Sequence, residues 1–206
     1  VGIKQIFGLF LLTNEIIYFS ISREPKERPK PPPPIATIFL LCIKTNELFM
    51  NLRQITTKDQ LELKKVYFDA IQSIDIKIYS QEQKRAWSSQ AWGNPNFDKS
   101  IIKGKGWLLS EKGIIIAFAT RYPNNRISLF YCKGKYQRKG CGSKLLNKLE
   151  IEAKQEGLYS LSTEASLISY KLFLKNEWKI IRKEKIIINN IFFERYKMVK
   201  IFKFNK

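Results

Sequence analysis

Apolar positions follow two periodicities along residues 50–201, and their alternation predicts a domain of mixed helices and strands. Alternating or wholly apolar short runs indicate strands, whereas apolar residues three or four positions apart indicate helices. The predicted order is β-α-α-β-β-β-α-β-α-β-β. Strands are predicted at 51–55, 106–110, 113–120, 126–132, 158–165, 178–188 and 192–201, and helices at 60–74, 80–92, from Ser143 to Gly157, and at 166–176.

Two of these helices have an assignable apolar face. In the first, Leu61, Val66, Phe68 and Ile71 are predicted to provide much of the apolar contact. In the third, the apolar positions fall at i, i+1, i+4 and i+8, which form one stripe along a helix. These positions are Leu145, Leu146, Leu149 and Ala153.

Turn residues separate the strands. Lys112-Gly113 and the segment "YPNN" divide residues 106–132 into a meander of three strands. Asn189 and Asn190 are predicted to form the tip of a closing hairpin. By contrast, residues 23–34 read "REPKERPKPPPP". Proline fixes φ and lacks an N–H donor, so this segment is predicted to be a polyproline-type linker, and a ligand for a proline-recognition module is the alternative.

The first 49 residues differ in pattern from the rest and are predicted to be an N-terminal extension with a Pro-rich linker, ahead of a domain at 50–206. Met50 opens a strand followed by helix-capping residues, as compact domains often begin. We therefore expect Met50 to be the true or an alternative initiator, with residues 1–49 outside the native domain. Mass determination of the native N-terminus tests this expectation, and a mature chain that retains Val1 contradicts it.

The composition of the chain excludes several classes of catalytic site. The chain has 206 residues, a formal charge of +19 and no histidine. The missing histidine excludes Ser-His-Asp and Cys-His nucleophiles and His-ligated zinc. The positive charge attracts polyanions, but no nucleic-acid-binding motif accompanies it.

The spacing of the cysteines and the length of the apolar runs indicate which cellular compartment to expect for the protein. Cys42, Cys132 and Cys141 are too widely spaced for a disulfide framework or a metal clamp. The longest apolar runs are too short to span a bilayer. We expect a reduced cytoplasmic protein that has no metal and does not associate with a membrane.

One turn carries the strongest chemical signal. After the predicted strand 126–132, residues 137–143 read Q-R-K-G-C-G-S and enter a helix directly. The first turn of a helix leaves amide N–H groups unpaired, and the helix dipole makes that end partly positive. Glycines let the backbone approach an anion closely, and Arg138 and Lys139 add full charges. The segment lacks the Walker A spacing and the GxGxxG spacing. A phosphate cradle is predicted; a Gly-rich helix entry with solvated cations is the alternative.

Q-R-K-G-C-G-S resembles the Q/R-x-x-G-x-G/A signature of the GNAT superfamily of N-acetyltransferases, in which this turn holds the pyrophosphate of acetyl-CoA. Nearly all of residues 50–200 resembles one poorly characterised bacterial branch of that superfamily. The companion motifs are "AW" at 86–87, "TEAS" at 163–166, a Phe-containing helix ending in Asn176-Glu177-Trp178, and "ERYKM".

The resemblance implies an α/β fold with a central mixed, mostly antiparallel sheet, splayed where the strands 126–132 and 158–165 part. Pantetheine would lie in that gap, bonded to the backbone of Phe130, Tyr131 and Cys132, where an N–H could polarise the thioester carbonyl. The implied pyrophosphate site is Gln137, Arg138, Lys139, Gly140, Cys141, Gly142 and Ser143.

The acid and the base are harder to assign. Glu164 is the best carboxylate for deprotonating the amine, and a strand-end ion pair is the alternative role. Many relatives have an acidic residue where Ser128 stands. The tyrosine that often protonates the leaving thiolate is Phe173 here, and Tyr170 is the substitute candidate. The usual Gly at the end of that helix is Glu177, which predicts an altered helix end.

The sequence thus favours an acetyl-CoA-dependent N-acetyltransferase in which a small-molecule or protein amine attacks directly. A degenerate CoA-binding domain and a basic nucleic-acid-binding protein are the alternatives. No specific nucleic acid is expected, and a homodimer is left open.

Overall fold

The computed structural model describes residues 50–203, so the extension at 1–49, the Pro-rich linker, Cys42 and residues 204–206 lie outside the described residues. Seven strands form one sheet. They are β1 Met50–Gln54, β2 Lys105–Glu111, β3 Ile114–Arg121, β4 Arg126–Cys132, β5 Ser160–Ser166, β6 Lys179–Ile188 and β7 Ile191–Ile201.

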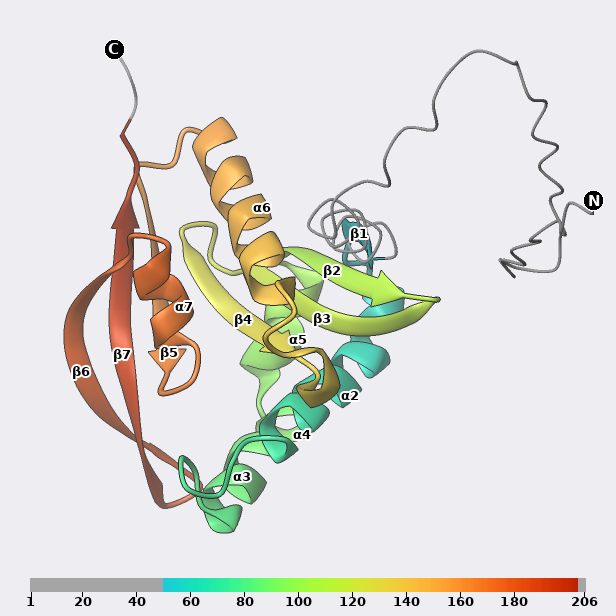
Figure 1. Ribbon diagram of the computed structural model, residues 1–206, viewed down its shortest axis with the longest axis vertical. Coiled ribbons are helices and arrows are strands. Elements are labelled where there is room, and N and C mark those ends of the chain that lie inside the picture. Colours follow the sequence, from blue (N-terminus) through green and yellow to red (C-terminus); the bar gives the residue numbers. More distant parts are fainter. Residues whose placement is uncertain (1–49, 204–206) are drawn as a thin grey trace, which may run out of the picture. The chain divides into compact units, whose positions relative to one another are not determined.

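Six α-helices and two 3₁₀ turns connect the described strands (Figure 1). The helices are α2 Gln60–Gln72, α3 Gln81–Ser88, α4 Gln90–Gly93, α5 Pro95–Ile102, α6 Cys141–Gln155 and α7 Tyr170–Lys175, and the 3₁₀ turns are η1 Thr57–Asp59 and η2 Gly134–Tyr136. The predicted strands, the three-stranded meander and the Asn189-Asn190 hairpin are confirmed, with both asparagines at positive φ.

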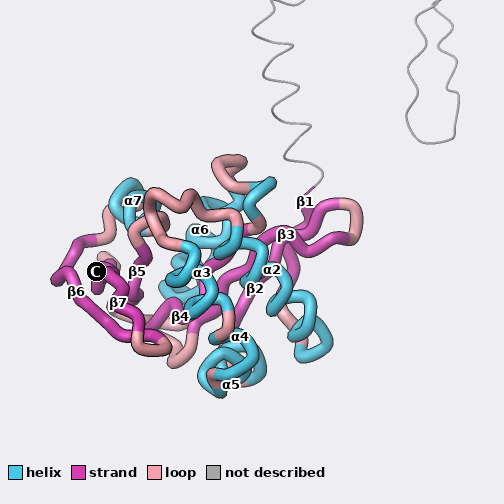
Figure 2. Tube along the Cα trace, turned by 90° about the horizontal axis from the view of Figure 1, so that it is seen from below, coloured by secondary structure: helices cyan, strands magenta, loops and turns pink. Residues whose placement is uncertain are grey.

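The sheet order is β1-β2-β3-β4-β5-β7-β6, and Figure 2 shows β1 and β6 at its opposite ends. Every neighbouring pair is antiparallel except β4 and β5, which run parallel. That parallel pairing covers only Arg126 with Ser162 and Ile127 with Thr163. The predicted mixed, mostly antiparallel and splayed sheet is therefore confirmed.

A β-bulge marks the point where the two strands part. On β3, Thr120 pairs with Leu129 while the next residue, Arg121, pairs with Ile127, so Ser128 is an extra residue on β4. A bulge bends its strand and increases the local twist. Because pairing with β5 ends at Ile127, next to this bulge, the bend at Ser128 accounts for the separation of β4 from β5.

Two hydrophobic cores lie on opposite faces of the sheet. One gathers the apolar stripe of α6 with Phe173 of α7 and with Trp178, and the other gathers α2, α3 and α5. The predicted α6 stripe is confirmed, since Leu145, Leu146, Leu149 and Ala153 are all buried. Side chains of β4 alternate between the cores: Phe130 packs on the α6 side, and Tyr131 packs on the α2 side. A gap between β4 and β5 therefore opens towards both helical layers.

The predicted apolar face of α2 is partly wrong. Val66 and Ile71 are buried, but Leu61 is 60% exposed and Phe68 is 45% exposed. The buried residues are Leu63, Val66, Tyr67, Ala70 and Ile71, spaced by three or four, so Leu61 and Phe68 lie on another side of the helix. Phe68 packs instead against Trp92, with ring centroids 6.0 Å apart.

Helix α5 is absent from the sequence prediction. Asn94 caps it, because its side-chain oxygen accepts a hydrogen bond from the Asn96 amide at 2.9 Å, and Pro95 occupies the first helical position. Both residue types are favoured at those positions, so a signal was present. At the other end of the chain, α7 is shorter than predicted because Ser166 ends β5 and residues 167–169 form a turn before the helix begins at Tyr170.

The end of α7 corrects a further expectation. Glu177 adopts φ 64, the left-handed conformation that glycine usually supplies there. The Trp178 amide donates to the Phe173 carbonyl at 3.1 Å, and the Glu177 amide donates to the Leu174 carbonyl at 3.0 Å. These two bonds are the Schellman pattern, so the helix end keeps its usual geometry and Glu177 carries backbone strain instead.

Glu177→Gly is therefore expected to stabilise the fold by about 0.5–1 kcal/mol, because it removes that strain. Chemical denaturation measures the change as a higher midpoint at constant slope. Lys175→Gly in the same helix is the control and should lower the midpoint. A midpoint for Glu177→Gly at or below that of the parent chain contradicts the explanation.

Candidate functional site

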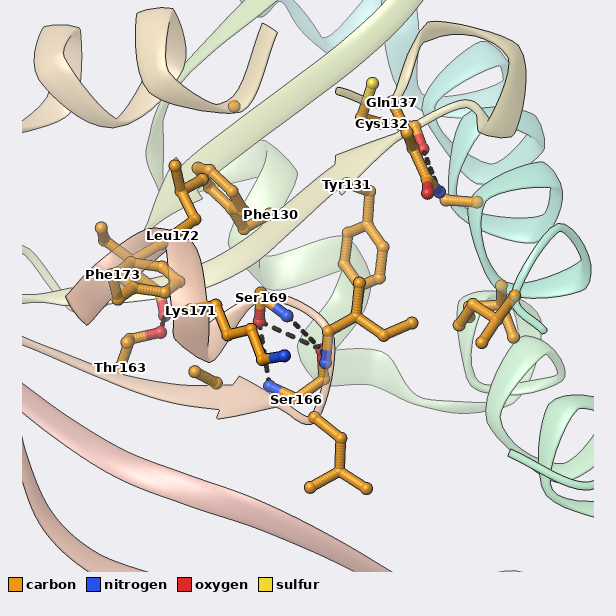
Figure 3. Close-up of a pocket in the computed structure, with 18 of the residues that line it drawn as sticks. Phe130, Tyr131, Cys132, Gln137, Thr163, Ser166, Ser169, Lys171, Leu172 and Phe173 are labelled. Carbon is orange, nitrogen blue, oxygen red and sulfur yellow. Dashed lines mark hydrogen bonds between the residues drawn. The ribbon is translucent and has the colours of Figure 1, made fainter. Parts of the chain in front are cut away.

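A cavity of about 710 Å³ lies where β4 and β5 part (Figure 3). Its lining comes from β4, the turn before α6, the end of β5, the start of α7, and α2 with the segment that follows it. Phe130, Leu172 and Phe173 lie at one end of the view in Figure 3, and Tyr131 lies between them and the α2 side. The cavity therefore reaches both faces of the sheet through the split.

The turn at 137–143 is shaped by two left-handed residues. Arg138 has φ 62 and Gly140 has φ 84, and Gly140 is the N-cap residue of α6. Within residues 50–203, no amide from residue 138 to residue 143 donates a hydrogen bond to another residue. These N–H groups stand at the positive end of a fifteen-residue helix. Such a turn is suited to bind an oxyanion.

Gly142 allows another segment to approach this turn closely. A Cβ atom added at Gly142 would lie 2.8 Å from Leu172 Cδ2 and 3.5 Å from Phe130 Cζ. Gly142 also lines the cavity. The absence of a side chain there leaves the first turn of α6 open to a ligand that passes between α6 and α7.

Of the ten residues predicted to bind cofactor, eight line the cavity. They are Phe130, Tyr131, Cys132, Gln137, Arg138, Gly140, Gly142 and Ser143. The side chains of the other two do not reach it. Lys139 places its Nζ atom over the Tyr136 ring, 5.3 Å from the centroid, and Cys141 is 2% exposed within the α6 core. Lys139 and Cys141 could contribute main-chain amides only.

Cys132 and Cys141 lie close enough to share a hydrogen bond across the turn. This bond lowers the pKa of Cys141 to about 7 and raises the pKa of Cys132. Both cysteines are free, and the sulfur of Cys141 also lies 3.8 Å from that of Met50. The packing role predicted for Cys141 agrees with its burial.

β4 presents an unpaired edge to the cavity. Residues 129–132 pair with β3 on one side, and beyond Ile127 the described sheet has no pairing between β4 and β5. The rings of Phe130 and Tyr131 are fixed on opposite faces. Phe130 packs on Phe173 with centroids 5.3 Å apart, and Tyr131 packs on Tyr67 with centroids 4.5 Å apart.

Glu164 lies on β5 directly after the last residue that pairs with β4, and it lines the cavity. Its Oε2 atom accepts a hydrogen bond from Arg126 Nε at 2.7 Å and forms an ion pair with the Arg126 Nη2 atom at 2.6 Å. The strand-end ion pair considered as an alternative role therefore exists. The carboxylate nevertheless remains at the cavity wall.

Tyr170 is not placed for the predicted role. It does not line the cavity, and its ring stacks on Tyr196 of β7 with centroids 4.6 Å apart. Lys171 and Lys175, four residues apart on α7, are the cationic residues of this helix that line the cavity. Since successive helical residues point about 100° apart, the phenol of Tyr170 is directed away from that wall. Phe173 does line it but has no acidic proton.

Sequence reasoning missed three features of the site. Ser166 and Ser169 share a hydrogen bond of 3.0 Å between their hydroxyls and shape the turn before α7. Lys171 adds a cation to the wall, and Ser128 forms the bulge, with its hydroxyl 3.0 Å from that of Thr120. Only the serine-rich letters "ASLIS" at 165–169 offered a signal for the turn.

Two further observations concern metals and membranes. Within residues 50–203, no cluster of three or more His, Cys, Asp or Glu side chains could hold a metal ion. In the same part of the chain, no helix is both long and apolar enough to cross a bilayer.

Comparison with solved structures identifies proteins of the same fold. A GCN5-related N-acetyltransferase from Rhodopseudomonas palustris superposes with a TM-score of 0.69 at 22% identity, covering 74% of this chain and 95% of that one. The PaiA N-acetyltransferase from Thermoplasma acidophilum, in complex with coenzyme A, gives 0.58 at 18% identity, with 74% and 99% covered. YncA from Salmonella typhimurium, with its cofactor acetyl-CoA, gives 0.52 at 14% identity, with 76% and 96% covered.

None of the curated proteins compared with the chain matches it. The family comparison matches residues 76–200 to the acetyltransferase (GNAT) domain. That match includes the bulged strand β4, the turn at 137–143 and the whole split between β4 and β5. The chain therefore belongs to the GNAT acetyltransferase family.

Proposed function

We propose that the protein transfers the acetyl group of acetyl-CoA to the nitrogen of an amine acceptor. One observation carries the proposal: the main-chain amides of 138–143 donate to no other residue within 50–203, and Arg138, Gly140, Gly142 and Ser143 of this turn line a cavity that passes between two separating strands. Two structures of the same fold contain coenzyme A or acetyl-CoA, and the family match names acetyl transfer.

The residues present fit this co-substrate. The amides of 138–143, the N-terminus of α6 and the cation of Arg138 would hold the diphosphate. Gly142 keeps the approach clear, because any Cβ there would fill the space beside Leu172 and Phe130. The unpaired edge of β4 at Phe130, Tyr131 and Cys132 offers main-chain groups to the pantetheine arm.

Bound acetyl-CoA would supply a thioester whose carbonyl carbon is open to attack. A bond forms between the amine nitrogen and that carbon, the carbon–sulfur bond breaks, and the electron pair leaves with sulfur. The acceptor enters as an ammonium and loses two protons in all; one protonates the thiolate and one is released. The protein orients both substrates, and a β4 amide is proposed to polarise the carbonyl.

Glu164 is proposed to receive the first proton from the ammonium, directly or through water, because it is the carboxylate at the split. Glu164→Gln is expected to lower kcat about tenfold or more and to leave coenzyme A affinity unchanged. Steady-state thiol release and calorimetry measure the two quantities.

Glu184→Gln is the matched control, since Glu184 is also a strand carboxylate paired with arginine, on β6 away from the cavity. Equal rates for Glu164→Gln and the parent chain remove Glu164 from the mechanism. A fall in coenzyme A affinity would assign it a binding role instead.

Protonation of the thiolate is proposed to come from solvent, because Tyr170 lies outside the cavity and Phe173 has no proton to give. Replacing Tyr170 with Phe should then leave kcat within about twofold of the parent value. A large loss of kcat at unchanged stability would restore the phenol to the mechanism.

Thermal denaturation with acetyl-CoA, coenzyme A or duplex DNA tests the proposed function against its alternatives. Acetyl-CoA is expected to raise Tm, as any ligand of the folded state does, whereas DNA is not. A rise with DNA alone would favour a nucleic-acid-binding protein. A rise with acetyl-CoA but no thiol release with any amine would favour a CoA-binding domain without transfer activity.

A further inference from the structure

The part of the cavity wall that continues towards α3 differs chemically from the turn at 137–143. It is formed by Ile74, Ile78, Trp87, Tyr131, Leu167 and Ile168. All six side chains are apolar or aromatic. The turn at 137–143 begins beside the end of α2, where Gln137 Nε2 donates a hydrogen bond to Ser73 Oγ at 3.3 Å. The part of the cavity left for the acceptor is therefore the wall around Trp87 of α3, Tyr131 and Leu167.

The aromatic wall is rigid. Tyr67 donates a hydrogen bond from its hydroxyl to the Trp87 carbonyl at 2.8 Å and packs edge-on against Tyr131 at 4.5 Å. The Trp87 ring contacts Tyr131 at 6.3 Å and Tyr79 at 5.3 Å. Rings held by such contacts before binding lose little freedom when an apolar group packs on them.

The charges at the cavity wall disfavour an acceptor with several cations. Of the described residues that line the cavity, Glu164 is the only one with a carboxylate, and Arg126 already neutralises it at 2.6 Å. Arg138, Lys171 and Lys175 add positive charge to the same lining. Burial raises the pKa of Tyr131, so its phenol stays neutral and supplies no second anion.

The apolar lining continues past Ile78 and Leu167. A second hollow of about 480 Å³ shares these two residues with the main cavity. Its other lining residues are the aromatic Tyr79, Phe192 and Phe193 and the polar Gln83, Lys185 and Glu194. Its carboxylate, Glu194, is paired with Lys183 at 2.8 Å. A group larger than a methyl on the acceptor would thus meet further apolar surface and no unpaired anion.

We infer that the acceptor is a primary amine attached to an apolar or aromatic group and carrying no second positive charge, an inference that rests on the proposed transfer to an amine. A free arylalkylamine and a peptide N-terminus with an aromatic first residue share this chemistry. In both cases the apolar group packs on the Trp87–Tyr131 wall while the nitrogen points to the split beside Glu164.

Thiol release from acetyl-CoA with different amines tests the inference. The kcat/KM for 2-phenylethylamine is expected to exceed those for ethylamine and spermidine by about tenfold or more. The kcat/KM for a tripeptide that begins with Phe should exceed that for one that begins with Lys. Comparing the Phe tripeptide with 2-phenylethylamine shows whether a peptide N-terminus or a free arylalkylamine is the better acceptor. Spermidine or the Lys tripeptide as the better substrate overturns the inference.

A pair of variants tests whether the apolar group of the acceptor packs on the cavity wall at Ile78. Ile78 lines the cavity and is 45% exposed, whereas Ile76, two residues earlier in the same segment, is 64% exposed and does not line it. Ile78→Glu is expected to raise KM for 2-phenylethylamine about tenfold, to lower KM for spermidine, and to leave KM for acetyl-CoA unchanged. Ile76→Glu should change none of the three. Equal effects of the two variants contradict the assignment of this wall.

Failure of the inference is distinguishable from failure of the proposed function. If acetyl-CoA raises Tm but 2-phenylethylamine and the Phe tripeptide release no thiol, the acceptor inference is overturned and cofactor binding stands. If acetyl-CoA does not raise Tm, the proposed function itself is overturned.

Discussion

Gly142→Asp is expected to weaken coenzyme A binding by at least about 100-fold, equivalent to about 3 kcal/mol. The new side chain would start 2.8 Å from Leu172 Cδ2 and would place a negative charge where the diphosphate is proposed to lie. Calorimetric titration of the variant with coenzyme A measures the loss. Gly142 has an ordinary helical conformation within α6, so the fold should persist.

Two further variants separate the effect of the added side-chain volume from the effect of the negative charge. Gly142→Ala adds the Cβ without the charge, and because the nearest atom is the end of a flexible leucine, only a modest loss is expected. Gly93→Asp adds the same charge at the end of α4, where nothing lies within 4 Å of the added Cβ, and should leave affinity unchanged. Unchanged affinity for Gly142→Asp would count against the proposed diphosphate site.

Arg138→Glu is expected to give the second-largest loss, about 30- to 100-fold in coenzyme A affinity at low salt. Arg138 lines the cavity and is the first residue of the unpaired amide series. Reversal of its charge replaces attraction to the diphosphate with repulsion. The loss should shrink as ionic strength rises, because salt screens exposed charges.

Lys139→Glu is the matched control for Arg138→Glu. It makes the same charge change one residue later, but Lys139 is directed to the Tyr136 ring and does not line the cavity. Its expected loss is below about fivefold. Equal losses for the two variants would mean that general charge, and not a contact of Arg138, attracts the ligand.

Local patterns were sufficient to predict most elements of the fold. The apolar stripe of α6, the Lys112-Gly113 turn and the Asn189-Asn190 hairpin each follow from residue chemistry within a few positions. The errors arose where two local signals compete. On α2, Leu61 and Phe68 are as apolar as the buried residues, and only tertiary packing decides which side of the helix is covered.

The site was predictable in part. The turn at 137–143 combines glycines, cations and a helix start in consecutive residues, so its position at the start of α6 could be predicted from the sequence. The bulge at Ser128 could not be predicted, because a serine within a strand does not indicate that it will be the extra residue of a β-bulge. The prediction that Tyr170 protonates the thiolate also depended on geometry that the sequence does not reveal. The direction of the tyrosine side chain depends on where α7 begins, and the Ser166–Ser169 hydrogen bond delays that start.

The most direct test of the account is the response of individual amides to coenzyme A in ¹⁵N-resolved NMR spectra. If the turn at 138–143 holds the diphosphate, the largest changes are expected at the amides of residues 138–143, together with residues 130–132 of β4, and little change is expected at Gly113 in the distant β2–β3 turn. Saturable binding of coenzyme A that leaves the amides of 138–143 unshifted would contradict it.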